Sequence, residues 1–271
     1  MKYKLMIAAI LFFVACVATK QPAAQHIARE YFILYPEIKS MDIDGLGNLF
    51  VLDEDDRLTK FDSTGQIRHH VINPNLGSVH SVDIGNPFKV MVFYRDQQTI
   101  VLYDRTLSEL QRIRLADWEV KDITATGLSS DNAIWIFDGT NKVLRKMDDK
   151  GNAILTSDPF DMIRPPSMRP DYIYDVNHYL LLKEVSQPMA VFDDFAHYIQ
   201  PLNDIGENFS LTDQVLIYPS GAEIRLFDIA GLKYQNALPV EQKMTDFRVH
   251  YFSNRIYGQD DKGIFILDVK E

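Results

Sequence analysis

The amino-acid sequence predicts an all-β fold that is built from one repeated antiparallel unit. Aromatic residues are numerous, with 16 Phe and 13 Tyr among 271 residues, and aromatic side chains suit the half-buried, pleated surface of a sheet. Short apolar runs that end at an aspartate recur along the chain, and no stretch between them shows a convincing helical period.

The recurring aspartate gives the repeat its length. In the stretch DQQTIVLYDRTLSELQRI, three apolar residues and a tyrosine lead into Asp104, and a turn follows. Equivalent tripeptides are Lys60-Phe61-Asp62, Leu102-Tyr103-Asp104, Lys146-Met147-Asp148, Val191-Phe192-Asp193, Leu226-Phe227-Asp228 and Ile266-Leu267-Asp268. Successive aspartates are 42, 44, 45, 35 and 40 residues apart, so the sequence contains six units with a period near forty.

Each unit predicts four short strands. The first strands are expected at Met41–Asp44, Val82–Ile84, Ile123–Thr126, Tyr172–Val176, Phe209–Leu211 and Phe247–His250. The second strands are expected at Leu49–Leu52, Val90–Tyr94, Ala133–Phe137, Tyr179–Leu182, Val215–Tyr218 and Arg255–Tyr257. The aspartate ends the third strand, and after five of the six a fourth strand follows, such as Gln66–Ile72 or Leu110–Leu115. Four antiparallel strands per repeat predict a single six-bladed β-propeller.

The repeated aspartates are interpreted as structural turn caps, because an aspartate that begins a turn accepts hydrogen bonds from nearby backbone amides. The six caps are Asp62, Asp104, Asp148, Asp193, Asp228 and Asp268. The sixth unit has no fourth strand of its own, and the strand-like segment Arg29–Tyr35 is expected to supply it and close the ring. The expected organisation is a signal segment at 1–18, a linker at 19–28 and the propeller at 29–271.

The N-terminal residues have the proportions of an export signal. Lys2 and Lys4 precede an apolar stretch from Leu5 to Val17, which is too short to span a bilayer. Two interpretations of the single cysteine, Cys16, remain open. It resembles the acylated residue of a bacterial lipobox, although Phe13 stands where leucine is usual; alternatively, cleavage after Ala18 discards it. We therefore expect an exported protein of the periplasm, or one attached to the outer membrane through a lipid on Cys16.

The repeat resembles six-bladed β-propellers of the NHL and TolB-like kind, especially exported propeller proteins of Bacteroidota-type bacteria. The segment DIDGLGNLFVLDEDDRLTKFDSTGQI, residues 42–67, is the part most similar to that family, through its Asp-x-x-Gly-Asn turn before an apolar strand. The likeness weakens after Pro165 and extends at fold level over residues 29–271. It implies the fold and carries no catalytic motif.

Composition and motifs narrow the function classes. The formal net charge of −10, without any run of basic residues, argues against a nucleic-acid partner. No nucleophile elbow, phosphate-binding loop or dinucleotide-binding glycine pattern is present, so we expect no catalytic residues and no cofactor. One alternative is a calcium-dependent hydrolase of the lactonase kind, because carboxylates from neighbouring blades offer oxygen ligands for Ca²⁺. The candidate ligands are Asp53, Asp55, Asp56, Asp260 and Asp261.

The leading functional hypothesis is a non-enzymatic binding or scaffolding protein of a bacterial cell envelope, monomeric and with a protein partner on one rim of the propeller. The candidate partner-binding segment is the proline-rich loop that connects the third and fourth units. Its residues are Arg164, Pro165, Pro166 and Arg169. Prolines fix an extended backbone and leave hydrogen-bonding capacity unused, so this loop is suited either to docking or to rigid connection of two blades.

Overall fold

The structure is a computed structural model that describes residues 30–33, 37–86, 88–163, 168–203, 205–212, 215–220, 223–239, 246–250, 255–260 and 262–268. This part of the chain consists of antiparallel strands, turns and two short 3₁₀ helices, η1 (Pro74–Leu76) and η2 (Leu115–Trp118). Among the same residues, no helix has the length and apolar character needed to cross a bilayer.

Five sheets are each formed by four consecutive strands that pair in chain order. The first contains β2 (Ile38–Ile43), β3 (Leu49–Asp53), β4 (Leu58–Phe61) and β5 (Ile67–Val71). The second contains β6 (Ser81–Asn86), β7 (Lys89–Tyr94), β8 (Thr99–Asp104) and β9 (Glu109–Arg114). The third contains β10 (Ile123–Leu128), β11 (Ile134–Asp138), β12 (Val143–Met147) and β13 (Ala153–Thr156). The fourth contains β14 (Tyr172–Val176), β15 (Tyr179–Lys183), β16 (Met189–Asp193) and β17 (Tyr198–Leu202), and the fifth contains β18 (Ser210–Leu211), β19 (Val215–Ser220), β20 (Glu223–Asp228) and β21 (Lys233–Pro239).

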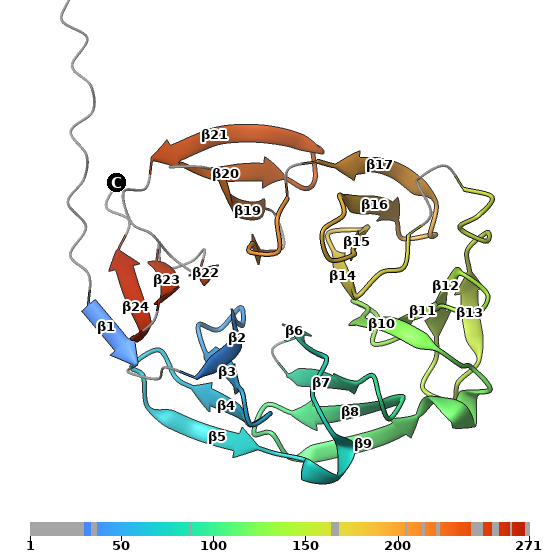
Figure 1. Cartoon of the computed structure of the whole chain (residues 1–271), viewed down its shortest axis with the longest axis horizontal. Helices are drawn as coiled ribbons and strands as arrows, with labels where there is room; N and C mark the ends of the chain where they lie inside the picture. Colours follow the sequence, from blue (N-terminus) through green and yellow to red (C-terminus); the bar gives the residue numbers. More distant parts are fainter. Residues whose placement is uncertain are drawn as a thin grey trace, which may run out of the picture.

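The remaining strands combine the two ends of the chain. The strands β22 (Asp246–His250), β23 (Arg255–Asp260) and β24 (Gly263–Asp268) pair in order, and β1 (Glu30–Ile33) lies antiparallel beside β24. Figure 1 shows the sheets placed around a common centre, with β2, β6, β10 and β14 toward the centre and β5, β9, β13, β17 and β1 at the periphery. The prediction of an all-β propeller built from four-stranded antiparallel blades is confirmed.

The core lies between neighbouring blades, where the flat faces of the sheets meet. Between the third and fourth blades, Phe137 packs edge-on against Phe160 at 4.9 Å between ring centroids, and Phe160 stacks on Phe192 at 5.2 Å. All three side chains are almost fully buried. Removal of one such ring from water contributes about 1.5–3 kcal/mol, so these layers hold the blades together.

Four of the predicted turn caps share one geometry. In each, the aspartate Oδ1 accepts the amides of the residues two and four positions later, and the residue three positions later has a positive φ. The aspartates are Asp62, Asp104, Asp148 and Asp193. Asp228 differs, because in its turn the amide of Leu232 donates to the carbonyl oxygen of Ile229, and its carboxylate lies 4.0 Å from Lys233 Nζ. The side chain of Asp268 lies outside the described residues.

Strand limits agree with the sequence prediction to within a few residues, with one informative exception. The fourth strand of the second unit was expected to run to Leu115, but β9 ends at Arg114 and Leu115 begins η2. Leu115 is fully buried, and its amide donates to the carbonyl oxygen of Gln98 at 2.9 Å. A buried apolar residue at the end of an apolar run looks like strand in the sequence, although its backbone here turns toward the next blade.

Candidate functional site

The two faces of the propeller differ in what they present. One face carries the turns that join the second and third strands of each blade, together with the connections between blades; we call it the connection face, defined by residues 54–57, 72–80, 95–98, 115–122, 139–142, 157–163, 168–171 and 184–188. The opposite, hairpin face carries the aspartate-capped turns and the turns between first and second strands. A cluster of charged side chains that joins two non-adjacent blades lies on the connection face, which makes it the candidate site.

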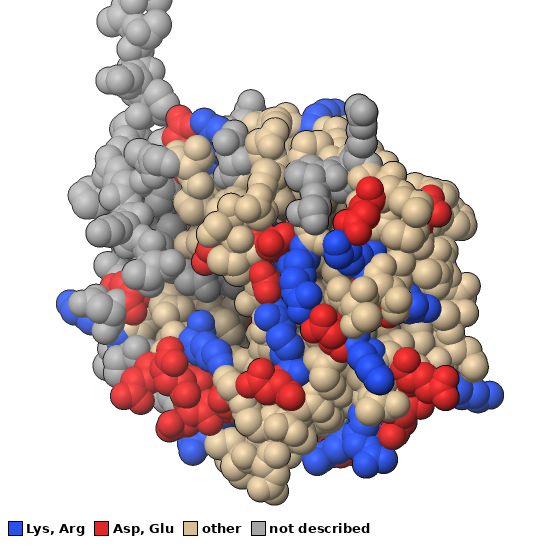
Figure 2. All heavy atoms as spheres, turned by 45° about the vertical axis from the view of Figure 1, so that its right-hand side comes forward, with Lys and Arg blue, Asp and Glu red and all other residues tan. Residues whose placement is uncertain are grey.

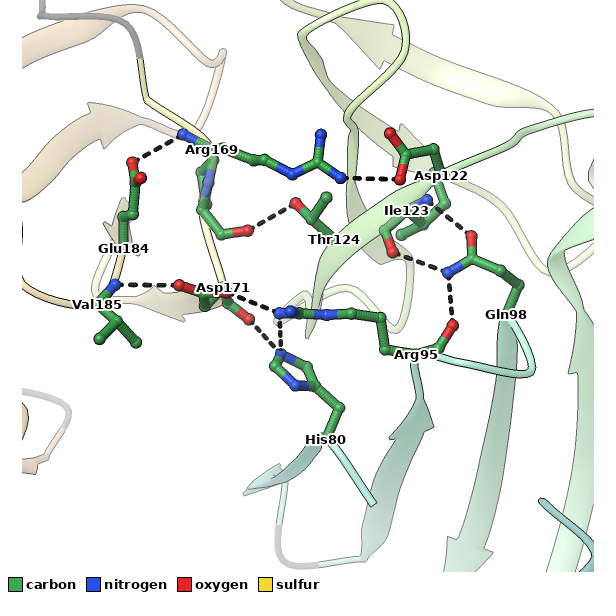
Figure 3. Close-up of polar contacts among 11 residues, drawn as sticks. His80, Arg95, Gln98, Asp122, Ile123, Thr124, Arg169, Asp171, Glu184 and Val185 are labelled. Carbon is green, nitrogen blue, oxygen red and sulfur yellow. Dashed lines mark hydrogen bonds and ion pairs between the residues drawn. The ribbon is translucent and has the colours of Figure 1, made fainter. Parts of the chain in front are cut away.

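The centre of this site is a contact between the second and fourth blades. Arg95, in the turn between β7 and β8, donates to Asp171 Oδ1 at 2.9 Å, and Asp171 directly precedes β14. His80, just before β6, contacts the Arg95 guanidinium and also lies 2.9 Å from the carbonyl oxygen of Asp171. Figure 3 shows the three side chains converging from their separate elements. We call His80, Arg95 and Asp171 the latch, because they connect two blades that have the third blade between them.

Two aromatic rings, those of Tyr172 and Phe93, pack against the His80 side of the latch. The ring of His80 stacks on Tyr172 at 5.3 Å with an interplanar angle of 13° and meets Phe93 edge-on at 5.9 Å. Burial raises the pKa of the Tyr172 hydroxyl, and the neighbouring Asp171 carboxylate raises it further. The latch therefore lies on a partly dry aromatic layer, where its polar contacts are less screened than they would be in water.

A second group of contacts holds the chain just before β14. Arg169 donates from its guanidinium to Asp122 Oδ1 at 2.8 Å, and its backbone amide donates to Glu184 Oε2 at 2.8 Å. The hydroxyl of Thr124 donates to the carbonyl oxygen of Pro170 at 2.6 Å, and the amide of Val185 donates to Asp171 Oδ2 at 3.0 Å. Residues 169–171 are thus fixed by groups from the second, third and fourth blades (Figure 3).

Gln98 fixes the start of the third blade in the same way. Its side-chain carbonyl accepts the amide of Ile123 at 2.7 Å, while its NH₂ group donates to the carbonyl oxygens of Ile123 at 2.9 Å and of Arg95 at 2.8 Å. A side-chain amide that satisfies both backbone groups of one residue behaves like a neighbouring strand. The turn that carries Arg95 is therefore tied to β10 as well as to the latch.

Lys39 makes the corresponding connection between the first and second blades. Its ammonium group donates to Asp56 Oδ1, to Ser78 Oγ and to the carbonyl oxygen of Val79, each at 2.9 Å. Desolvation raises the pKa of Asp56, but the hydrogen bonds from Lys39, Val79 and Ser78 outweigh it and hold that pKa below its usual range. Asp56 is therefore a fixed anion that joins two blades.

The predicted calcium ligands do not converge among the residues that the structure describes. Asp53 Oδ1 accepts the amides of Asp55 and Arg57, which makes it a cap of its own turn, and Asp56 is engaged by Lys39. Asp260 Oδ1 accepts the amide of Lys262 at 2.9 Å. Asp261 lies outside the described residues, and across the described ranges no three His, Cys, Asp or Glu side chains are grouped so that they would hold a metal ion.

The other predicted site residues are placed only in part. Arg169 lies in the candidate site, with 57% of its side chain exposed. Arg164, Pro165 and Pro166 fall outside the described residues, as does Cys16.

Charges of both signs are intermixed on the surface seen in Figure 2, where Lys and Arg side chains alternate with Asp and Glu and no broad basic area is present. Opposite charges are also paired within the third blade, where Arg145 and Asp138 lie 3.3 Å apart and Lys146 and Asp131 lie 2.8 Å apart. A surface of paired charges favours specific contacts over general attraction to a polyanion.

Sequence reasoning missed the latch. Its members are separated by up to 91 residues, and no local spacing relates them. The one available signal is position, because Arg95 follows a second strand and Asp171 precedes a first strand, and in a four-stranded blade both positions lie on the same face.

Comparisons with known proteins agree with the fold. No protein-family model matches the chain, and no curated protein matches it either. The WD40 domain of Neurospora crassa Pan2 superposes with a TM-score of 0.58 at 11% identity, covering 86% of this chain and 82% of that one. Streptogramin B lyase gives 0.55 at 12% identity, covering 90% and 88%, and the β-propeller domain of Myceliophteria thermophila Cps50 (Swd1) gives 0.57 at 10% identity, covering 90% and 100%. At such identities the similarity shows the fold alone, and that fold is a β-propeller.

Proposed function

We propose that this protein is a non-enzymatic binding or scaffolding protein of a bacterial cell envelope, and that its connection face binds a protein partner. The observation that carries the proposal is the presence of exposed apolar and arginine side chains on the connection face, which also contains the fixed segment 169–171. Met162 is 82% exposed and Val185 is 47% exposed, and Arg169 lies close to Val185 through Glu184 and Asp171. Methionine and arginine are enriched in protein interfaces, and a backbone that is already ordered loses little entropy on binding.

The charged groups of this face are better suited to positioning than to chemistry. Arg95, Arg169 and Lys39 are each engaged by a carboxylate of the same chain, at 2.8–2.9 Å. Intramolecular pairing of this kind stiffens the rim and leaves the outward-facing apolar side chains as the variable contact surface. A rigid rim with exposed anchors is typical of scaffolds rather than of catalytic pockets.

The envelope location is proposed from the N-terminal sequence. The apolar stretch from Leu5 to Val17 after two lysines supports export, and Cys16 at its end supports attachment of a lipid. Under this proposal, Cys16→Ser releases the protein from membranes, and labelled palmitate is incorporated only by the parent. An intact mass that begins at Thr19 would instead indicate a soluble exported protein.

We further propose that β1 closes a ring of six blades. The antiparallel pairing of Glu30 with Ile266 and of Ile33 with Ile264 supports this, because it gives the last three strands a fourth. Closure covers the outer edge of β24 and joins the two ends of the chain in one sheet, which gives the ring a fixed shape.

Site-specific photo-crosslinking in envelope preparations tests the binding proposal. A photoreactive residue at position 185 or 162 is expected to yield a defined adduct. Phe195, which is 64% exposed on the hairpin face, is the matched control position. Adducts that form at 185 and 162, are lost with Arg169→Ala and are absent at 195 support the proposal; equal labelling at all three positions, or none, argues against it.

A further inference from the structure

One nitrogen of His80 has two neighbours with incompatible requirements. Its Nε2 contacts the guanidinium of Arg95 and also lies 2.9 Å from the carbonyl oxygen of Asp171. A guanidinium group only donates hydrogen bonds, and a carbonyl oxygen only accepts them. Nε2 accepts from Arg95 when it carries no proton and donates to Asp171 when it carries one. The latch therefore has two hydrogen-bonding states, and protonation of the ring leaves only the second, because both ring nitrogens then carry a proton.

The surroundings of His80 favour the neutral ring. Burial against Tyr172 and Phe93 lowers the pKa of His80, the bond to the carbonyl oxygen of Asp171 raises it, and the charge of Arg95 lowers it again. The carboxylate of Asp171 and the ammonium of Lys39, which approaches from β2, complete the charged groups that face the ring. The net result is a lowered pKa, so the ring is neutral at neutral pH, and in the tautomer with its proton on Nδ1 it accepts from Arg95 through Nε2.

When the ring is charged, Arg95 depends on its ion pair with Asp171. Its Nε is buried and has no hydrogen-bond partner in the structure, and its contacts to Asp171 and His80 are made through a single terminal nitrogen. Protonation removes the acceptor at Nε2, places a second positive charge beside the guanidinium and turns Nε2–H toward the backbone of Asp171. About a third of the Arg95 side chain is exposed, so the guanidinium has a path to solvent.

We propose that His80 is an acid-sensitive switch that releases Arg95 from Asp171 when its ring is protonated. Release affects the candidate binding surface, because Asp171 Oδ2 holds the amide of Val185 and Arg169 lies two residues before Asp171. The biological meaning of the switch rests on the proposed function, but the conformational change itself is measured without any partner.

Hydrogen–deuterium exchange on the full chain between pH 7.5 and pH 5 tests the switch. After correction for the intrinsic pH dependence of exchange, protection of the Val185 amide is expected to fall about tenfold or more at pH 5. The amide of Phe195, which donates to Asp193 Oδ1 at 3.0 Å on the hairpin face, is the matched control and is expected to stay constant. His80→Gln, which does not titrate in this range, is expected to keep Val185 equally protected at both pH values.

Three results would overturn the inference: unchanged protection of the Val185 amide in the parent, the same loss of protection in the His80→Gln variant, or an equal loss of protection at Phe195.

Should His80→Gln not fold, Arg95→Gln gives a second test. Removal of the neighbouring charge is expected to raise the NMR titration midpoint of His80, and an unchanged midpoint would contradict the switch. Crosslinking from position 185 at both pH values separates the two proposals. A pH-dependent Val185 amide without any adduct would remove the proposed function and leave the switch in place.

Discussion

The carbonyl oxygen of Ile173, on β14, lies 2.6 Å from the position that a Cβ on Gly127 of β10 would occupy. The inner strands of the third and fourth blades therefore meet closely enough that only glycine fits at position 127. The same two strands are also linked at the connection face. There, Arg169, just before β14, binds Asp122, just before β10, and the latch residue Asp171 directly precedes β14. A backbone oxygen cannot move aside as a side chain would, so the fit depends on the missing Cβ.

Gly127→Ala is accordingly expected to separate β10 from β14 and to lower the free energy of unfolding by about 2 kcal/mol or more, as overpacking of a tight interior does. Urea denaturation measures the loss. Gly45→Ala is the matched control, because a Cβ there meets nothing within 4 Å. If both variants unfolded at the same urea concentration, the close approach of the two strands would not be a determinant of stability.

Arg95 and Asp171 are predicted to be coupled more strongly than Arg169 and Asp122. The first pair is half-buried, with 32% and 22% of the side chains exposed, whereas the second pair is 57% and 47% exposed. Double-mutant cycles with Arg95→Ala and Asp171→Asn are expected to give a coupling of about 1.5–3 kcal/mol. The same cycle at Arg169 and Asp122 is expected to give about 0.2–1 kcal/mol, since exposed ion pairs contribute little. Equal couplings would mean that burial does not strengthen the latch.

The capped turns predict a distinction between loss of charge and loss of an acceptor. Asp193 Oδ1 accepts the amides of Phe195 at 3.0 Å and His197 at 2.7 Å. Asp193→Ala leaves both amides without this acceptor and is expected to lower the free energy of unfolding by about 1–2 kcal/mol. Asp193→Asn keeps an oxygen at the same place and is expected to lose less than half as much. A thermal unfolding series of the parent and both variants measures the difference, and equal losses would show that charge matters rather than geometry.

The sequence predicted those features that repeat locally and missed those that join distant blades. The turns at Asp62 and Asp148 could be predicted, because the cap, the glycine three positions later and the start of the following strand all lie within five residues. His80, Arg95 and Asp171 carry no such signal, because the curvature of the ring brings them together. The calcium hypothesis shows the same limit: Asp53 and Asp56 looked available in the sequence, while the structure uses the first for its own turn and the second to bind Lys39.

Asp83 is predicted to make stability depend on pH in the direction opposite to most carboxylates. Burial raises the pKa of Asp83, hydrogen bonds from the amides of Leu128 and Gly85 lower it, and the charges of Asp42 and Asp175 raise it, with a net value of about 6. The folded state thus binds a proton more tightly than the unfolded chain, whose aspartate has a pKa of 3.8. The contribution of Asp83 to stability is present below about pH 4 and is lost as pH rises to about 6, at about 1.4 kcal/mol per pKa unit.

Asp83→Asn removes this titration. Relative to the parent, the variant is expected to gain in stability between pH 4.5 and pH 7.5 by on the order of 2 kcal/mol. Other carboxylates titrate in both proteins, so the difference between the two isolates Asp83. Denaturant unfolding at the two pH values provides the measurement. Parallel pH profiles would show that Asp83 is charged throughout this range in the folded protein.

The N-terminal strand provides the last prediction. Ile33 packs with Ile38, Met41 and Ile264, and β1 pairs along β24. A chain that begins at Leu34 loses this pairing and exposes the edge of β24, and exposed edges promote association between molecules. It is expected to unfold at a clearly lower temperature and to aggregate. A chain that begins at Glu30 lacks only residues 1–29 and keeps β1, so it is the matched control. It is expected to melt within about 2 °C of the parent. A loss of 1 kcal/mol in stability shifts the melting midpoint of a domain of this size by about 2–4 °C. Identical melting of the two truncated chains would mean that β1 does not close the ring, and the last three strands would then have to stabilise the propeller without it.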